Sequence, residues 1–273
     1  MTSTNAPRSW KAGPVHLRDF GGTGAPLLLA HGMAAHTHWW DPVVRRLPPA
    51  LRAAALDFRG HGESDWVADG VYTTETWVAD LETARAALGW DRFVLCGHSM
   101  GARIALEYAR AHPGRLRGVI AIDFLPEVSA GKPSRFSRAR GRSQPVYPDP
   151  EAMAARFRLE PDGTELSAEE LRVLGRHGVR AHGEGYSWKF DWRSLMHYRM
   201  GAVWPQLPEI QVPALVVRGE LSTIITREDF ARVARELPGA RALEIAGAHH
   251  HVPLDRPTEL ARAVADFAAS LPG

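Results

Sequence analysis

The sequence predicts an α/β fold in which a mostly parallel central sheet is flanked by helices and interrupted by a helical lid insertion. From Pro26 onward, short apolar, β-rich runs alternate with segments of helical periodicity, which is the pattern of a sheet covered on both faces. The alternation stops between Leu125 and about Leu207 and then resumes. A chain of 273 residues is long enough for one such domain with an insertion.

Each expected central strand is short and apolar, because a parallel strand covered by helices on both faces is shielded from water. The runs that fit this description are Leu27–His31, Ala53–Asp57, Phe93–Gly97, Gly118–Asp123, Ala214–Gly219 and Arg241–Ala246. Ahead of them, Val15–Phe20 is expected to form an edge strand. Helical periodicity covers Thr76–Leu88, Gly101–Ala111, Arg227–Leu237 and Pro257–Leu271, and proline or glycine closes most of these segments.

The chain is therefore divided into a first core part at residues 1–124, an inserted lid at 125–207 and a second core part at 208–273. The lid begins with a basic stretch, 132–142, that contains no acid and is either a solvated strip or a site for an anionic group. Its later part is expected to be helical and carries Tyr186, Trp188, Phe190, Trp192, Tyr198 and Trp204. These aromatics, with Trp39 and Trp40, either wall an apolar pocket or pack in a core.

Composition limits the class of function. The 33 basic and 31 acidic residues give a formal charge of +2, so no overall field attracts nucleic acid or an anionic membrane. Residues 1–10 lack the apolar core of a signal peptide, and no apolar run approaches the roughly 20 residues that span a bilayer. The single cysteine, Cys96, excludes an internal disulfide. We expect a cytoplasmic protein with a small-molecule partner, and the oligomeric state stays open.

The segment Gly97-His98-Ser99-Met100-Gly101 is the strongest local signal. It follows the apolar run Phe93–Cys96 and precedes a helical pattern, which is the order that a nucleophile elbow requires. Side chains at the two glycine positions would collide with the strand or helix, and the strained turn exposes the serine hydroxyl. Ser99 is therefore the candidate nucleophile if a base lies within hydrogen-bond reach. The alternative is a Gly-Ser turn without chemistry.

The catalytic base is expected late in the chain, where Gly247-Ala248-His249-His250-His251-Val252-Pro253-Leu254 offers three histidines. Here the sequence resembles the α/β-hydrolase superfamily, whose members often carry a Gly-x-Gly-His-x-x-Pro-Leu segment. Aligning the first glycine and the Pro-Leu pair puts the catalytic position on His250, with His249 in place of the second glycine. A metal cluster is the rival for adjacent histidines. No metal is expected, because neighbours in sequence point in different directions and no further ligand motif accompanies them.

The resemblance covers almost the whole chain apart from the lid. It includes His31-Gly32-Met33 after the first central strand and the segment 57–64 after the next. In this family the His-Gly pair precedes the oxyanion-hole residue, so the resemblance implies that the backbone N–H groups of Met33 and Met100 stabilise the oxyanion. It also implies that 57–64 is a structural loop, in which His61 is not catalytic.

The third catalytic residue is ambiguous, because the commonest family pattern places an aspartate shortly after the penultimate strand. That stretch reads Gly219-Glu220-Leu221-Ser222-Thr223, which leaves Glu220 as one candidate. Asp123 is favoured, because some bacterial esterases with a similar Asp-x-x-Pro segment and Gly-x-x-Ser loop use that aspartate. At the end of the strand beside the elbow strand, Asp123 could orient His250 and stabilise its imidazolium.

These residues predict a serine hydrolase that acts by acyl transfer and needs neither metal nor organic cofactor. Serine at the elbow, where dehalogenases and epoxide hydrolases of the superfamily carry aspartate, argues against an alkyl-enzyme. A carboxylic ester of modest size is the preferred substrate. Lactone, thioester and carbon–carbon bond hydrolysis and perhydrolysis remain open, since one site supports each. A non-catalytic ligand-binding protein on the same fold is the alternative of another class, and it predicts eroded catalytic positions.

Overall fold

The central sheet has eight strands in the order β1-β2-β4-β3-β5-β6-β9-β10. The computed structural model describes residues 6–127, 143–198 and 201–272. The strands are β1 (Arg8–Ala12), β2 (Val15–Gly21), β3 (Ala25–Ala30), β4 (Leu51–Asp57), β5 (Phe93–His98), β6 (Leu116–Ile122), β9 (Ala214–Gly219) and β10 (Arg241–Ile245). The strands from β4 to β10 in this order pair in parallel, so the expected mostly parallel sheet is confirmed.

The N-terminal edge of the sheet differs from the prediction. Val15–Phe20 is not the edge strand, because β1 pairs antiparallel with β2 on its outer side. β1 reads Arg-Ser-Trp-Lys-Ala, and its side chains are exposed or half-buried. A strand that is not buried lacks the apolar run by which the central strands are recognised, so the sequence pattern missed it.

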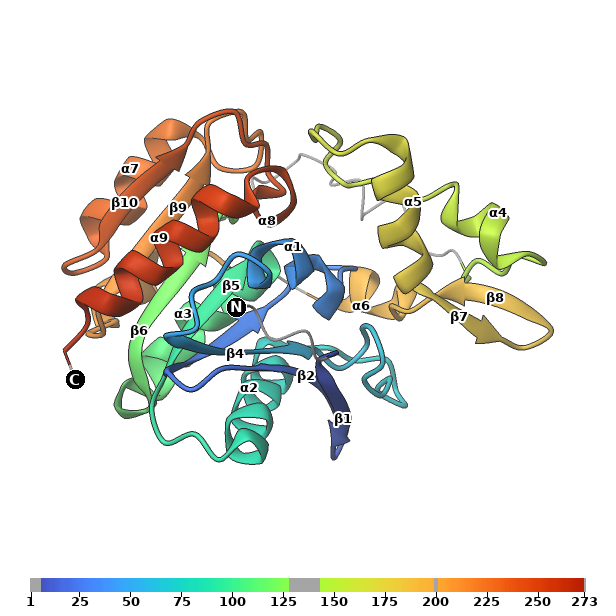
Figure 1. Cartoon of the computed structure of the whole chain (residues 1–273), viewed down its shortest axis with the longest axis horizontal. Coiled ribbons are helices and arrows are strands. Elements are labelled where there is room, and N and C mark those ends of the chain that lie inside the picture. The colour runs from blue at the N-terminus through green and yellow to red at the C-terminus, as the bar shows by residue number, and fades with distance from the viewer. Residues whose placement is uncertain (1–5, 128–142, 199–200, 273) are drawn as a thin grey trace.

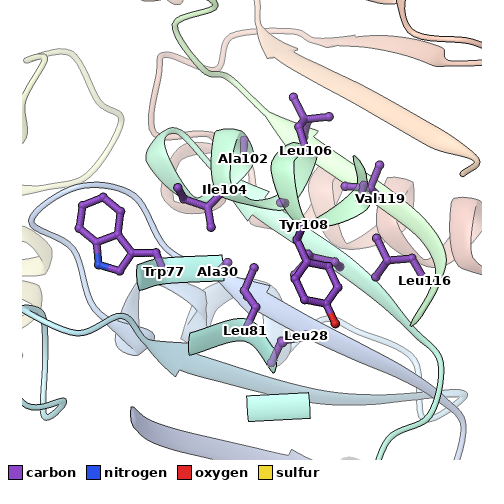
Figure 2. Close-up of a cluster of buried hydrophobic side chains, with 14 of the residues drawn as sticks. Leu28, Ala30, Trp77, Leu81, Ala102, Ile104, Leu106, Tyr108, Leu116 and Val119 are labelled. Carbon is purple, nitrogen blue, oxygen red and sulfur yellow. The ribbon is translucent and has the colours of Figure 1, made fainter. Parts of the chain in front are cut away.

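Helices cover both faces of the sheet (Figure 1). They are α1 (Asp41–Val44), α2 (Thr74–Leu88), α3 (Met100–Ala111), α7 (Arg227–Glu236), α8 (Val252–Asp255) and α9 (Pro257–Ser270). Leu28 of β3 joins the core formed with α2, α3 and α7, part of which Figure 2 shows. Leu29 joins the core formed with α1, α8 and α9, because successive side chains of a strand point to opposite faces. In the described parts of the chain, no helix has the length and apolar character that crossing a membrane requires.

In its described residues, the segment between β6 and β9 adds no strand to the central sheet, and its elements α4, α5, β7 and β8 lie on the right of Figure 1. It contains α4 (Pro150–Ala154), α5 (Ala168–His177), β7 (Val179–His182), β8 (Gly185–Trp188), α6 (Trp192–His197) and the 3-10 helix η4 (Trp204–Glu209). The expectation that Tyr186 and Trp188 belong to a helix is wrong, because β7 and β8 form an antiparallel hairpin. Gly183, with a φ of +59°, supplies the turn that the hairpin needs. The basic stretch 132–142 lies outside the described residues.

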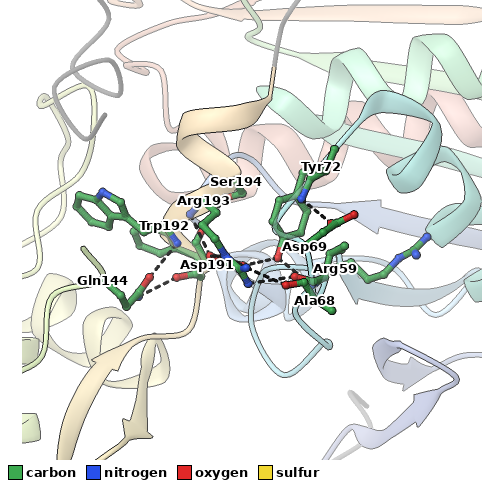
Figure 3. Close-up of polar contacts among 12 residues, drawn as sticks. Arg59, Ala68, Asp69, Tyr72, Gln144, Asp191, Trp192, Arg193 and Ser194 are labelled. Atoms are coloured by element: carbon green, nitrogen blue, oxygen red, sulfur yellow. Dashed lines mark hydrogen bonds and ion pairs between the residues drawn. The ribbon is translucent and has the colours of Figure 1, made fainter. Parts of the chain in front are cut away.

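Asp191 ties this segment to the loop that follows β4 (Figure 3). Its carboxylate accepts a hydrogen bond from the Tyr72 hydroxyl at 2.7 Å and pairs with Arg193 at 2.8 Å. Arg193 in turn donates to the carbonyl oxygens of Val67 and Ala68, both at 3.0 Å. Because the carboxylate is buried, these partners replace the water that it loses on folding.

The loop at 57–64 is organised around a second buried carboxylate, that of Asp57. It accepts from the backbone N–H groups of Thr37 and Glu63 at 2.7 and 3.1 Å and faces His16 at 2.7 Å. A Cβ on Gly62 would lie 2.1 Å from Cγ of Asp57, so only glycine allows the loop to close around the carboxylate. These contacts hold β2, β4 and η1 (Thr37–Trp40) together.

Candidate active site

Ser99 occupies the sharp turn between β5 and α3, with a φ of +54°. A Cβ on Gly97 would lie 2.2 Å from the carbonyl oxygen of Gly101, and a Cβ on Gly101 would lie 2.4 Å from that of Ala30. Only glycine fits at either position, because no real Cβ approaches backbone so closely. The strand and helix thus pack tightly enough to hold Ser99 in a strained conformation, with its side chain at the wall of a cavity.

Three predicted site residues from distant parts of the sequence meet at this turn. Nε2 of His250 lies 3.1 Å from Oγ of Ser99, and Nδ1 of His250 lies 2.7 Å from Oδ1 of Asp123. His250 comes from the loop between β10 and α8, while Asp123 directly follows β6, the neighbour of the elbow strand. The carboxylate of Asp123, the imidazole of His250 and the hydroxyl of Ser99 are therefore joined by one continuous line of hydrogen-bond contacts.

Asp123 is fully buried, and its carboxylate is surrounded by donors. Besides facing His250, it accepts from the Ser222 hydroxyl at 2.6 Å and from the backbone N–H of Gly219 at 2.8 Å. Its φ of +39° is unusual for an aspartate and turns the chain sharply as β6 ends. These contacts fix the carboxylate in one orientation relative to the imidazole.

Glu220, the alternative acid, has a different set of contacts. Its Oε2 accepts from the backbone N–H of Gly247 at 2.8 Å, and its Oε1 lies 4.0 Å from the guanidinium of Arg227. Its side chain is 41% exposed. Among the contacts of the described residues, none joins Glu220 to His250. Glu220 thus braces the loop that carries the histidine without facing the imidazole.

Burial controls the charge of the histidine and aspartate pair. It lowers the pKa of His250 to about 3, because a buried imidazolium loses its hydration. Burial also raises the pKa of Asp123 to about 6, against the opposing effect of the hydrogen bonds from Ser222 and Gly219. At neutral pH the imidazole is therefore uncharged, and the carboxylate accepts its Nδ1 proton. Nε2 is left with a lone pair directed at Ser99.

The two predicted oxyanion residues lie on the wall of the same cavity as Ser99. Met33 lies in the loop after β3, and Met100 is the first residue of α3. Within the described parts of the chain, neither backbone N–H donates to another residue. His31 fixes the approach to Met33, because its Nδ1 contacts the carbonyl oxygen of Gly32 at 2.7 Å and its Nε2 accepts from Phe58 at 3.1 Å. Both amides are thus free to donate to a ligand.

Two adjoining cavities open at the site. The one that contains Ser99 and His250 has a volume of about 220 Å³, and its neighbour has a volume of about 420 Å³. Met33, Trp39 and Glu160 line both of them. The aromatic residues that line the larger cavity are Trp39, Phe157, Trp188, Phe190 and Trp192. The aromatic residues named from the sequence thus fall into two groups. Those just listed, apart from Phe157, wall a cavity as one alternative expected, whereas Trp40 packs in the core as the other expected.

The histidine run does not form a cluster by itself. A group of ring nitrogens within 4.8 Å of one another comes from His250, His251 and His98, the last of which belongs to the elbow. His249 is not part of it, and its backbone N–H donates to Asp255 at 3.0 Å. Three imidazoles are a possible ligand set for a transition metal, but the nitrogens would have to close to about 3.4 Å to share one zinc ion.

Several residues at the site were not singled out from the sequence. The Nε2 atom of His98 contacts the backbone oxygen of His250 at 2.9 Å and so helps to position the loop. Ser222 was noted only as part of a Gly-x-x-Ser loop, although its hydroxyl contacts Asp123 directly. Arg103, one helical turn after Ser99, lines the cavity. The sequence feature that could have pointed to Arg103 is its position in the largely apolar helix after the elbow, because a cation on a buried helix face is unusual.

The chain matches the family model described as the alpha/beta hydrolase fold over residues 25–257, and it therefore belongs to that family. A crystal structure of E-2-(acetamidomethylene)succinate hydrolase superposes with a TM-score of 0.81 over 97% of this chain and 99% of that chain, at 24% identity. This structural likeness concerns the fold, and the family assignment rests on the match over residues 25–257.

Three sequence relatives of this chain are named as a hydrolase, a deformylase and an esterase. It is 25% identical over 249 residues, which are 90% of this chain and 88% of the relative, to 2-(acetamidomethylene)succinate hydrolase of Mesorhizobium japonicum. It is 27% identical to N-formylmaleamate deformylase of Pseudomonas putida, with 92% of this chain and 91% of the relative covered. An esterase of Mycobacterium tuberculosis is 25% identical, with 94% and 88% covered.

Proposed function

We propose that this protein is a serine hydrolase that cleaves carboxylic esters, with Ser99 as nucleophile, His250 as general base and Asp123 as the acid of the triad. The observation that carries the proposal is the unbroken line of contacts from Oγ to Nε2 at 3.1 Å and from Nδ1 to the carboxylate at 2.7 Å. A hydroxyl is a weak nucleophile at its own pKa, and a neutral imidazole at this distance can remove its proton during attack.

In the proposed reaction, Ser99 attacks the ester carbonyl while its proton passes to Nε2 of His250. The backbone N–H groups of Met33 and Met100 donate to the oxyanion of the tetrahedral intermediate. His250 then returns the proton to the leaving alkoxide, which leaves an acyl group on Ser99. In the second half, the imidazole takes a proton from water, the hydroxide attacks the acyl carbonyl, and Ser99 regains its proton. Atoms and protons balance without a cofactor.

Asp123 is preferred to Glu220 as the acid because it faces Nδ1 and is buried. A buried carboxylate next to the imidazole stabilises the imidazolium more strongly than an exposed one, since water screens the interaction less. Glu220 instead bonds the backbone of Gly247. In this proposal Glu220 supports the loop that carries His250.

We also propose that residues 125–207 act as a lid between two core parts, 1–124 and 208–273. Glu160 and Pro161 belong to this segment and line the cavity that contains Ser99. The larger cavity is walled mainly by residues of the same segment. The lid would then cover the bound acyl group and set the size of the group that fits.

Hydrolysis of a small amide is a second candidate, supported by the names of two relatives whose substrates contain an amide, 2-(acetamidomethylene)succinate and N-formylmaleamate. The same triad serves both bonds, and the difference lies in protonation of the leaving group. The ester remains the first candidate, and the esterase relative covers as much of this chain as the two relatives with amide substrates do.

A fluorophosphonate probe tests the nucleophile, because it reacts with an activated serine whatever the natural substrate is. We expect a single adduct on Ser99 and none in the variant Ser99→Ala. Failure of the wild-type protein to form the adduct would favour a ligand-binding protein on this fold. A panel of p-nitrophenyl esters of graded length, measured beside lactones, thioesters and anilides, then identifies the bond that is cleaved.

A further inference from the structure

A cationic side chain, Arg103, lies in the wall of the cavity that contains Ser99. It belongs to α3, and its backbone N–H donates to the carbonyl oxygen of Ser99 at 3.3 Å, so the two residues are one helical turn apart. Only 7% of Arg103 is exposed. A guanidinium in this position is within reach of a substrate group close to the reacting carbonyl.

No acid neutralises this cation in the described parts of the chain. Its guanidinium donates instead to the backbone carbonyls of Leu125, Pro126 and Gly201. Its Nε is buried and has no hydrogen-bond partner. The Tyr198 side chain also forms a hydrogen bond with Arg103, and the hydroxyl of a tyrosine is neutral at neutral pH. A buried charge is costly unless it is paired, so an arginine held by carbonyls and a hydroxyl leaves an excess of positive charge at the cavity.

The adjoining cavity has the same sign of charge. It is lined by Arg156, Arg158 and Lys189, and of these Lys189 forms an ion pair with Glu63 at 2.5 Å. The guanidinium of Arg156 lies over the ring of Tyr147, and that of Arg158 donates to carbonyl oxygens of its own segment. Neither arginine pairs with a carboxylate among the described residues.

One acid, Glu160, lines both cavities and opposes these cations. Since Lys189 is paired with Glu63, the described lining residues of the two cavities leave three guanidinium groups, those of Arg103, Arg156 and Arg158, against this single carboxylate. An excess of one sign in a low-dielectric cleft attracts a ligand of the opposite sign.

We infer that the substrate carries a carboxylate, which Arg103 binds while the scissile carbonyl lies against Ser99. This inference rests on the proposed function and narrows it to esters or amides of dicarboxylic acids or similar anionic acyl compounds. Guanidinium is the side chain best suited to a carboxylate, because its planar N–H groups form short, charge-assisted hydrogen bonds.

A purely structural role for Arg103 makes a different prediction. The carbonyls that it binds lie at the two ends of the inserted segment, so Arg103 also holds that segment to α3. Loss of this anchor would slow every substrate alike, whereas loss of a carboxylate site slows the anionic substrate specifically. The ratio of two matched substrates therefore separates the two roles.

The experiment compares kcat/KM for p-nitrophenyl hydrogen adipate and p-nitrophenyl hexanoate, whose acyl chains have equal length and differ in the terminal carboxylate. We expect the wild-type protein to prefer the adipate monoester, and Arg103→Met to lower the ratio about tenfold or more. Arg103→Lys should retain part of the preference, because it keeps the charge. Arg110→Met is the matched control, since Arg110 is an arginine of the same helix that pairs with Glu107 at the surface and lines neither cavity. An unchanged ratio in Arg103→Met overturns the inference.

Binding without turnover provides an independent readout. Adipate is titrated into the Ser99→Ala variant by calorimetry, and into Ser99→Ala combined with Arg103→Met. Binding by the first protein and an affinity about tenfold lower in the second supports the carboxylate site. Equal affinity in both, or no binding by either, contradicts it. If the wild-type protein cleaves neither ester while adipate binding still depends on Arg103, the proposed reaction fails and the anion site stands.

Discussion

Ser222 donates its hydroxyl hydrogen to Oδ1 of Asp123 at 2.6 Å, and the same oxygen faces Nδ1 of His250 at 2.7 Å. The backbone N–H of Ile224 donates to the Ser222 oxygen at 3.2 Å, which orients the hydroxyl toward the carboxylate. The loop after β9 therefore supplies a donor to Asp123, the proposed acid, where the commonest family pattern has the acid itself in this loop.

This contact predicts the pH dependence of the reaction. Burial raises the pKa of Asp123 to about 6, and the Ser222 hydrogen bond opposes that rise by stabilising the ionised form. Activity needs the ionised carboxylate, so kcat/KM should fall as the pH drops through about 6. Ser222→Ala removes the stabilising donor, which raises the pKa further and moves the acid limb to higher pH. The exposed neighbour supplies the control, because Thr223→Ala should leave the profile unchanged; an identical shift in both variants would refute this account.

The identity of the acid is tested by two substitutions of nearly equal shape. Asp123→Asn should lower kcat by about 10²- to 10⁴-fold, because an amide cannot stabilise the imidazolium and favours the wrong tautomer. Glu220→Gln should leave kcat within about threefold, because its contact is with the backbone of Gly247. Steady-state kinetics on one ester suffice, with fluorophosphonate labelling to verify that the serine is still accessible. The reverse order of effects would make Glu220 the acid.

Close packing at the elbow predicts an effect on stability. Gly97→Ala would place a Cβ 2.2 Å from the carbonyl oxygen of Gly101, so strand and helix must separate. We expect a loss of about 3 kcal/mol or more in the free energy of unfolding, measured by urea denaturation. Gly114→Ala is the matched control, because no atom lies within 4 Å of its Cβ position, and it should change stability by less than about 1 kcal/mol. Equal stability of the two variants would mean that the elbow is not tightly packed.

The hydroxyl of Tyr72 is expected to contribute to stability by holding the inserted segment to the loop after β4. It donates to Asp191 at 2.7 Å and accepts from the backbone N–H of Val67 at 3.0 Å (Figure 3). Tyr72→Phe leaves both partners short of one contact and should lower the free energy of unfolding by about 1–3 kcal/mol. Thr83→Ala, which removes an exposed hydroxyl from α2, should cost less than about 0.5 kcal/mol. A Tyr72→Phe melting curve that coincides with the wild type would show that Asp191 is held by Arg193 alone.

The central part of the fold was predictable because burial leaves a record in the sequence. A strand covered on both faces must be apolar along its whole length, so β3, β4, β5, β6 and β9 were recognisable. The strand β10 was also expected, although it lies at the edge of the sheet and is largely exposed. The elbow was equally clear, since its residue types and their spacing stand together in one five-residue segment, although the contact that requires Gly101 is with the distant Ala30. β1 and the β7–β8 hairpin were missed, because an exposed or half-buried strand is defined by its partner and not by its own composition.

The sequence by itself determined the α/β class, the candidate nucleophile at Ser99 and the short list of partners, because each depends on local spacing or on residue type. The tertiary structure alone decided which acid faces His250, since Asp123 and Glu220 both follow strands and differ only in where the chain brings their carboxylates. It also decided that Arg103 lines the cavity without a counter-charge among the described residues. Charge compensation depends on distances between segments far apart in the chain, and no pattern of neighbouring residues records them.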